Sequence, residues 1–148
     1  MINKILPIYI VLLLGSLSLF SCSEPDEADI LNQRIDSLVS AIEKHDEKGI
    51  KEFLSKDFSA KEGLNKTQFF LFARYHFKRN KNVVITIIDK EVRLNKEQAD
   101  VTAKVLLIGA SEWLPERGQF YNVASRWQKE SGDWVMSRLR WEVEGKQN

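Results

Sequence analysis

Residues 45–58 read His-Asp-Glu-Lys-Gly-Ile-Lys-Glu-Phe-Leu-Ser-Lys-Asp-Phe, and this stretch decides how the chain is expected to fold. Gly49, in the middle of a charged run, is typical of a tight link between two elements. Directly after it, Ile50, Phe53 and Leu54 recur at the three-to-four-residue spacing of a helix. The stretch therefore predicts a link followed by a second, short helix.

Amphipathic patterns flank this stretch on both sides. Upstream, apolar residues recur at helical spacing between polar ones, which predicts a helix from about Glu27 to His45. Its apolar residues are Leu31, Ile35, Leu38 and Ile42. Downstream, Asn65 and Gln68 form a capping-box pattern that opens a third helix, from Lys66 to Arg79. The apolar face of this helix contains Phe69, Phe72, Ala73, His76 and Phe77, with Phe70 alongside.

After Asn82 the pattern changes from helical to extended. Val83 to Ile88 are β-branched almost throughout, and the strand is predicted to continue through Val92 and Leu94. Three further strands are predicted, with a hairpin turn at Ser131-Gly132 before the last; they are Ala99–Ile108, Phe120–Lys129 and Trp134–Glu142. Helices that precede a run of strands indicate an α+β fold with an antiparallel meander, not a parallel sheet.

In their order along the chain, these features resemble the nuclear transport factor 2-like superfamily, which includes ketosteroid isomerases and many small binding proteins. In that superfamily an acidic residue and a glycine, here Gly49, commonly join the first two helices. An acidic-apolar pair, here Asp57-Phe58, closes the second helix. The last hairpin adds Trp127, Gly132 and Trp134. The resemblance implies one domain over residues 30–144, in which N-terminal helices pack on a curved antiparallel sheet as a cone with a pocket at its open end.

The resemblance also offers Glu62 as a catalytic base, because enzymes of the superfamily place a carboxylate after the second helix. Asp57 is a second candidate. The isomerases keep a proton-donating tyrosine where this chain has Leu38, which cannot donate a hydrogen bond, so half of that mechanism is missing. Glu62 is equally typical of a solvated loop. We therefore expect a ligand- or partner-binding module without catalysis, with a small isomerase- or lyase-like enzyme as the alternative.

Aromatic and basic side chains on the last two strands are the better candidates for a ligand-binding surface. Alternation along a strand directs some of them into the cone, but the sequence does not settle the register that selects them. The candidates are Tyr121, Arg126, Arg138 and Arg140. Arg138 and Arg140 share a face, and an inward pair would favour an anionic ligand. The tryptophans Trp127, Trp134 and Trp141 are expected to pack in the core.

The remaining polar patterns favour structural roles. His45 and His76 are the only histidines; we expect His45 on the surface and His76 half-buried in its helix, and no metal site is predicted. The basic cluster from Arg74 to Lys81 is more typical of a helix C-terminus, where cations interact favourably with the helix dipole, than of contact with anionic lipid headgroups. The chain has no glycine-rich phosphate loop, so no cofactor is implied.

Residues 1–21 are typical of a bacterial signal peptide. The apolar run Ile5–Leu19 is shorter than the about 20 residues that a membrane span requires. Directly after the run, Leu19-Phe20-Ser21-Cys22 resembles the lipobox of bacterial lipoprotein precursors, although Phe20 is bulkier than the usual residue. The alternative is an ordinary secretory signal, or an uncut anchor helix, with a chance cysteine. The only cysteine of the chain nevertheless stands where the apolar run ends.

The lipobox resemblance implies cleavage before Cys22 and fatty acylation of this cysteine, palmitate included. Several acyl chains give stable anchoring that one chain cannot. Residues 22–29 would then be the lipidated cysteine and its tether. Ser23 stands where an inner-membrane retention signal usually has aspartate, which implies the periplasmic face of the outer membrane.

Composition limits the remaining classes of function. The chain has 148 residues, of which 43% are hydrophobic and 29% charged, and this suits one globular domain. It contains 22 Lys and Arg against 21 Asp and Glu, which is no basic excess for holding nucleic acid by its phosphates. The partners that we expect are the membrane, a small molecule or an envelope protein, and a second copy, because members of the superfamily often dimerise through the convex sheet.

Overall fold

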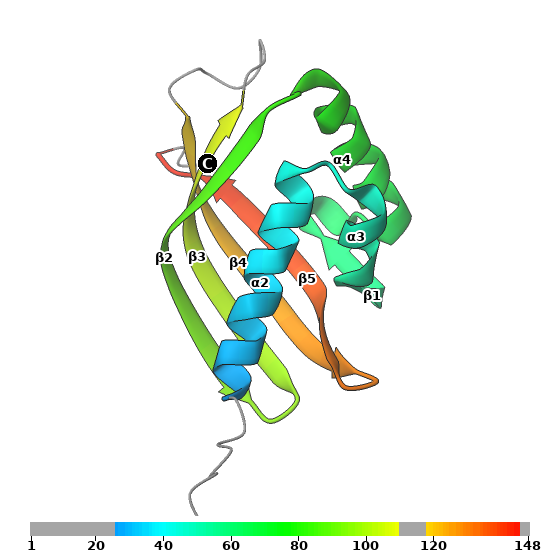
Figure 1. The fold of residues 1–148 in the computed structure, drawn as a ribbon, viewed down its shortest axis with the longest axis vertical. Coiled ribbons are helices and arrows are strands. Elements are labelled where there is room, and N and C mark those ends of the chain that lie inside the picture. Colours follow the sequence, from blue (N-terminus) through cyan, green and yellow to red (C-terminus); the bar gives the residue numbers. More distant parts are fainter. Residues whose placement is uncertain (1–25, 110–117, 146–148) are drawn as a thin grey trace, which may run out of the picture.

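The computed structural model describes residues 26–109 and 118–145 (Figure 1). The predicted signal peptide and Cys22 lie outside these residues. The described elements, in chain order, are α2 (Glu27–Glu43), α3 (Glu47–Glu52), β1 (Leu54–Ala60), the 3-10 turn η1 (Lys61–Gly63), α4 (Lys66–Arg79), β2 (Val83–Asn95), β3 (Gln98–Gly109), β4 (Gln119–Glu130) and β5 (Asp133–Val143). Within this part of the chain, no helix is long and apolar enough to cross a membrane.

Helix α2 confirms the first predicted helix. The Asp26 side chain caps its start by accepting a hydrogen bond from the Ala28 N–H, and the predicted apolar face buries Leu31, Ile35 and Leu38 against the sheet. The helix ends before His45 because His45 has a left-handed backbone conformation, with φ of 55°, which an α-helix cannot contain.

The link after α2 explains why an acidic residue and a glycine occur together there. The Asp46 side chain caps α3 by accepting a hydrogen bond from the Gly49 N–H at 3.0 Å, and a Cβ atom on Gly49 would collide with that carboxylate. The predicted second helix included Phe53 and Leu54, but α3 stops at Glu52 and Leu54 is the first residue of a strand. Asp57-Phe58 therefore lies within a strand and does not close a helix.

The sheet has five strands in the order β1-β5-β4-β3-β2. The predicted antiparallel meander from β2 to β5 is confirmed. Strand β1 was not predicted, and it pairs with β5 in parallel, so the sheet is mixed. Its register shifts between Leu54 and Ser59, and this irregularity hides the alternation by which a strand is recognised in a sequence.

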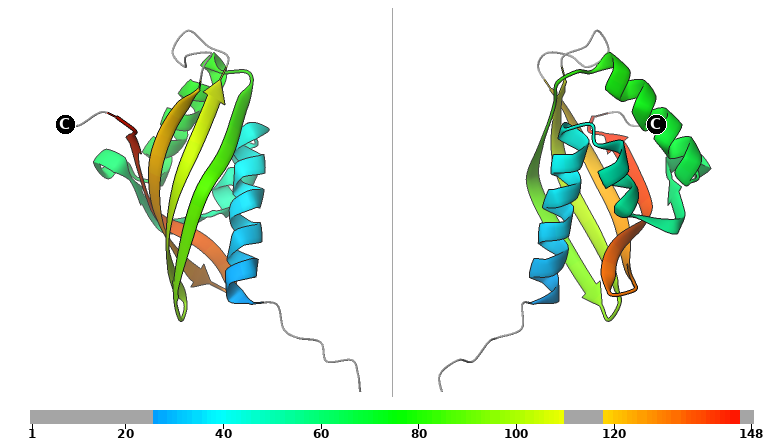
Figure 2. Two further views of the ribbon diagram at one scale, coloured as in Figure 1. Left: turned by 90° about the vertical axis from the view of Figure 1, so that its left-hand side faces the viewer. Right: turned by 45° about the vertical axis from the view of Figure 1, so that its right-hand side comes forward.

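The sheet curves around α2, which lies along its inner face (Figure 2). Trp127 and Trp134 are buried in the core, as predicted, and each indole N–H has an acceptor. Trp127 donates to the Ser125 Oγ at 3.0 Å, and Trp134 donates to the Glu27 Oε2 at 3.1 Å. Trp141 is only partly buried, so the prediction of core packing is incomplete for this residue.

The molecule has two unlike ends along its long axis (Figures 1 and 2). At one end lie the start of α2 and the β2–β3 and β4–β5 turns, and we call this the turn end. At the other lie the last turn of α4 and the end of β5, and we call this the open end.

Candidate functional site

The register of β3, β4 and β5 places the predicted arginines on the outer face of the sheet, away from the helices. Residues directly opposite each other in an antiparallel pair share a face. Arg126 lies opposite both Asp100 and Arg138, and Arg140 lies opposite Ala124. The Arg126 Nε donates to the Asp100 Oδ1 at 2.8 Å. Because Arg138 and Arg140 are exposed on the outer face, they do not form the inward pair that would favour an anionic ligand in the cone.

Tyr121 occupies the inner face instead. It alternates with the exposed Asn122 along β4, and its neighbour Val123 lies opposite Trp141 of β5. Tyr121 and Trp141 are therefore diagonal neighbours on the inner face. Burial raises the pKa of the Tyr121 phenol, so at neutral pH this hydroxyl keeps its proton and remains able to donate a hydrogen bond.

Helix α4 covers this part of the inner face only loosely. It carries the aromatic side chains Phe69, Phe70, Phe72, Tyr75 and Phe77, and none of its residues is fully buried. The predicted capping box fixes its start, since the Asn65 Oδ1 accepts from the Gln68 N–H and the Gln68 Oε1 accepts from the Asn65 N–H, both at 3.0 Å. A well-capped helix with no buried side chain leaves apolar surface accessible to a ligand.

The rings of α4 and β5 form an aromatic cluster, which consists of Phe58, Phe69, Phe72, His76 and Trp141. The centroid of Phe72 lies 4.4 Å from that of His76 and 5.8 Å from that of Trp141. Phe69 lies 5.1 Å from Phe58, whose ring is buried. Phe72, in contrast, is 40% exposed. The cluster thus extends from the core to the solvent.

His76 is the titratable member of this cluster, and it is exposed, not half-buried as predicted. Partial desolvation of its ring lowers its pKa and, to a smaller extent, so does the charge of Arg79. At neutral pH the imidazole is therefore uncharged, with one nitrogen that donates and one that accepts a hydrogen bond. His76 and Tyr121 are the polar groups that we associate with this apolar surface.

The two predicted catalytic carboxylates lie elsewhere. Asp57 is exposed on β1, where alternation directs it away from the side on which Phe58 meets the cluster. Glu62 is exposed in η1, with a left-handed φ of 64°. Leu38, at the position of the isomerases' donor tyrosine, is buried in the core. Neither carboxylate lies in the apolar surroundings that tune a catalytic base.

His45 does not lie on the surface as predicted. Its ring stacks on Phe77 with centroids 4.5 Å apart, and its Nε2 is buried without a hydrogen-bond partner among the described residues. The left-handed backbone at His45 turns the chain at the end of α2, which the periodicity of the sequence does not reveal. In the described ranges, no three His, Asp or Glu side chains gather as a metal site.

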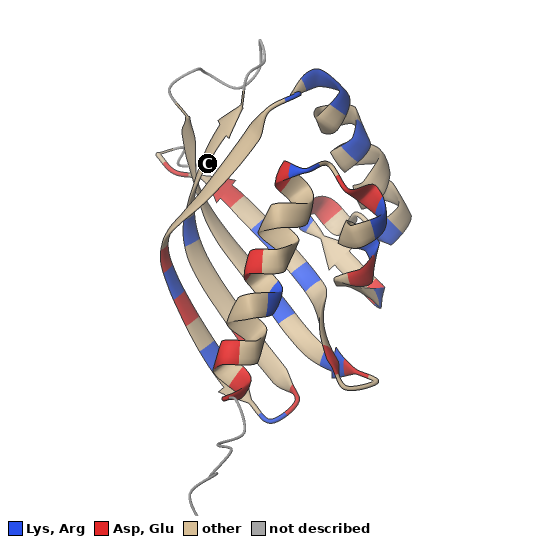
Figure 3. Ribbon diagram, viewed as in Figure 1, with Lys and Arg blue, Asp and Glu red and all other residues tan. Residues whose placement is uncertain are grey.

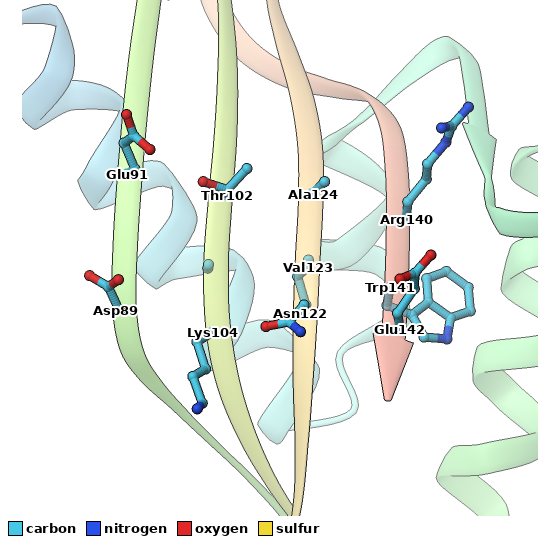
Figure 4. Close-up of a pocket in the computed structure, with 11 residues that line it drawn as sticks. Asp89, Glu91, Thr102, Lys104, Asn122, Val123, Ala124, Arg140, Trp141 and Glu142 are labelled. Atoms are coloured by element: carbon cyan, nitrogen blue, oxygen red, sulfur yellow. The ribbon is translucent and has the colours of Figure 1, made fainter. Parts of the chain in front are cut away.

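The outer face carries a shallow hollow of about 510 Å³ that the sequence did not indicate (Figure 4). Its base contains small side chains such as Ala124 and Thr102, while Asp89 and Glu91 line it on β2 and Arg140 on β5. Lys104 and Glu142 line it as well, so the hollow carries charges of both signs. In the sequence these residues are ordinary exposed positions that alternate along each strand. The hollow becomes visible only when the four strands are paired side by side.

No protein-family model and no curated protein matches the chain. Solved structures do match. A nuclear transport factor 2-like protein from Cytophaga hutchinsonii has a TM-score of 0.67 at 16% identity, over 80% of this chain and 99% of that one. A hexachlorocyclohexane dehydrochlorinase from Novosphingobium barchaimii has a TM-score of 0.64 at 13% identity, over 79% and 86%. Bd1075 from Bdellovibrio bacteriovorus has a TM-score of 0.69 at 13% identity; the match covers 79% of this chain but 40% of that longer one.

These matches show that the chain has the nuclear transport factor 2-like α+β fold. A putative ketosteroid isomerase from Shewanella frigidimarina is among the structures with this fold, with a TM-score of 0.64 at 14% identity. At such low identity the shared fold does not transfer a substrate or a reaction.

Proposed function

We propose that this chain is a lipid-anchored envelope protein whose domain binds an apolar small molecule at the aromatic cluster, without catalysis. The observation that carries the proposal is helix α4, which has five aromatic side chains and no fully buried residue. Packing alone does not account for such a helix, because aromatic side chains are stabilised chiefly by burial.

The chemistry of the cluster selects a flat ligand with few polar groups. A planar ring can stack on Phe72 or meet Trp141 edge to face, and it removes apolar surface from water at about 25 cal/mol per Å². His76 and Tyr121 would orient the ligand through single hydrogen bonds, as in most small-molecule sites.

The absence of catalysis is supported by the placement of the carboxylates. Asp57 and Glu62 are both exposed, outside the aromatic cluster, and Leu38 replaces the donor. The isomerase- or lyase-like alternative requires one of these carboxylates to reach a bound ligand, and it stays a prediction.

Binding at the cluster is tested with N-phenyl-1-naphthylamine, an uncharged aromatic fluorescent probe, titrated against the full chain. Phe72→Ser is expected to weaken binding about tenfold, which corresponds to about 1.4 kcal/mol. Phe120→Ser is the matched control, because Phe120 is 38% exposed on the outer face where Phe72 is 40% exposed beside the cluster. Equal effects of the two substitutions would place the binding surface elsewhere.

The anchor is tested by the mass and fractionation of the protein made in a bacterium. We expect a chain that begins at Cys22, is heavier by its acyl chains and sediments with the outer membrane. Cys22→Ser is expected to leave the precursor uncut. An unmodified soluble product would contradict the anchor and the periplasmic location that depends on it.

We further propose that two copies associate through the outer face of the sheet. A twofold axis that runs along the strands between β3 and β4 would lay β5 of one copy, with Arg138 and Arg140, over β2 of the other, with Asp89 and Glu91. Arg140 would then meet Glu91, which lies in the same row across the sheet. Within the part of the chain that the structure describes, neither arginine has an ion-pair partner. Sedimentation equilibrium should show a dimer that Arg138→Glu with Arg140→Glu dissociates and that the added changes Asp89→Arg and Glu91→Arg restore. A dimer insensitive to both sets would exclude this interface.

A further inference from the structure

The face of α4 that points away from the sheet is apolar and basic at once. Leu71 and Tyr75 lie one turn apart on it and are 62% and 54% exposed. Lys78 continues the same line by almost one further turn, since residues three and four apart share a helix face. We call Leu71, Tyr75 and Lys78, with Lys81 just beyond the helix, the outer α4 stripe. It adjoins the aromatic cluster, which lies toward the sheet, because the Tyr75 ring meets the His76 ring edge to face with centroids 5.4 Å apart.

Along the sequence the charge of this region has one sign, although the carboxylate of Glu47 pairs with Arg74 and interacts electrostatically with Lys78. Between Glu62 and Asp89 the sequence contains no acidic residue, whereas Lys66, Arg74, Lys78, Arg79 and Lys81 are basic. Figure 3 shows the basic residues gathered toward the C-terminal end of α4.

Three of these cations are already engaged within the molecule, and the Lys66 Nζ donates to the Leu54 carbonyl at 2.6 Å. The Arg74 Nη2 lies 2.6 Å from the Glu47 Oε2. The Arg79 Nη1 donates to the Tyr75 hydroxyl at 2.7 Å, and its guanidinium lies 5.3 Å from the centre of the Tyr75 ring, which holds that ring on the outer face. Lys78 and Lys81 are exposed and make no ion pair with a described residue. They remain available to an external anion.

The helix dipole explains only part of this arrangement. Cations near a helix C-terminus are favourable, and this accounts for Lys78 and Arg79. It does not account for Leu71 and Tyr75, which expose apolar surface next to those cations. Adjoining apolar and basic side chains match a partner that presents apolar groups and carboxylates together.

We propose that the outer α4 stripe binds an acidic segment of a partner polypeptide, in which apolar side chains alternate with Asp or Glu. Leu71 and Tyr75 would contact the apolar side chains, and Lys78 and Lys81 the carboxylates. We favour a polypeptide over an anionic bilayer because of the lipid anchor, and this choice rests on the proposed function. The anchor fixes which end of the domain faces the membrane, and the stripe lies at the other end.

The bilayer that holds Cys22 lies at the turn end of the domain. The chain from Cys22 to Asp26 has four residue-to-residue steps and spans at most about 14 Å. Strand β2, from Asn95 near the turn end to Val83 just after Lys81, has 13 residues and is roughly 40 Å long. Lys78 and Lys81 are therefore presented at the end of the molecule away from the anchor (Figures 1 and 3).

The test is a titration of the lipidated protein, in phosphatidylcholine vesicles, with a fluorescent peptide of alternating Glu and Leu. We expect saturable binding that Lys78→Glu with Lys81→Glu weakens at least about tenfold. Lys56→Glu with Lys96→Glu is the matched control, because it makes the same charge change at two exposed lysines on other elements, and it should leave binding nearly unchanged. No binding to the wild type, or an equal loss in both variants, would overturn the proposal.

The lipid alternative has its own readout. A polarity-sensitive dye on Leu71→Cys should be unchanged when phosphatidylglycerol is added to the vesicles, and a blue shift would place the stripe in a bilayer and overturn the proposal. The anchor fails separately, since an unanchored protein would not float with vesicles. In that case the peptide titration in free solution decides on the stripe alone.

Discussion

The turn end and the open end of this domain use the same kinds of residue for different purposes. At the turn end, Trp134 is 2% exposed, and its indole N–H and the Lys129 ammonium both donate to the carboxylate of Glu27. At the open end, Trp141 is half-buried against Phe72, which solvent reaches. We infer from this difference that the contacts between helix α2 and the last hairpin contribute most to stability. Binding surface remains where α4 packs loosely.

The largest expected effect is a contrast between two tryptophans. Trp134→Ala removes a buried indole and should lower the free energy of unfolding by about 3–5 kcal/mol. Trp141→Ala removes a half-buried ring and should cost about half as much or less. Chemical denaturation of both variants measures the two costs. An equal loss of unfolding free energy in the two variants would mean that the open end is packed as tightly as the core, which would contradict the proposed difference between the two ends.

Two arginines give the next contrast. Arg34 of α2 donates to the backbone carbonyls of Trp134 at 3.1 Å and Glu52 at 3.0 Å, and its guanidinium lies over the Phe53 ring. Arg34→Met should destabilise the domain by about 2 kcal/mol, since hydrogen bonds from a charged group are lost. Arg74→Met removes an exposed ion pair and should cost less than about 1 kcal/mol. A larger cost for Arg74 would show that α4 depends on that pair.

The smallest expected effect is a contrast in pH dependence between two carboxylates. Hydrogen bonds from Lys129 and Trp134 lower the pKa of Glu27, and a hydrogen bond from Arg74 lowers the pKa of Glu47. A lowered pKa in the folded state gives stability that is complete above about pH 5 and is lost as the pH falls through the folded-state pKa.

Glu27→Gln should therefore flatten the fall in global stability below about pH 5. Glu47→Gln should act chiefly on local opening of α4, because Arg74 lies on that helix. Denaturation at several pH values measures the first effect and amide hydrogen exchange of α4 the second. If Glu47→Gln flattened the global profile as much as Glu27→Gln, the two ends would unfold as one unit.

Sequence patterns anticipated the parts of the site that depend on neighbours along the chain. The capping box at Asn65 opened α4 where predicted, and the Asp46–Gly49 link formed because one carboxylate both caps the helix and excludes a larger residue. The predicted apolar face of α4 does turn toward the sheet, through Phe69 and Phe72. That none of its residues is fully buried could not be predicted, because burial depends on the sheet opposite.

The parts that were missed depend on contacts between distant segments. Strand β1 acquires its partner from β5, about eighty residues later in the chain, and its shifted register removes the alternating pattern. The placement of Arg138 and Arg140 was equally undecided, because a shift of one residue in a strand reverses every side chain. A bulge at Ser137 of β5, opposite Arg126 and Trp127 of β4, directs Arg138 and Arg140 outward while the tryptophans on both strands still face the core.

By itself the sequence determined the order and the type of helices and strands from β2 onward, the helix caps, and the likeness to a known fold, since these follow from periodicity and local hydrogen bonds. It also supplied the expectation of a lipid anchor at Cys22, which concerns residues outside the described structure. Only the tertiary structure decided that α4 leaves its aromatic side chains accessible, that the arginines face outward beside a hollow, and that β1 completes the sheet. Each of these is a pairing of surfaces far apart in the chain, and such pairings are set by the packing of the whole domain.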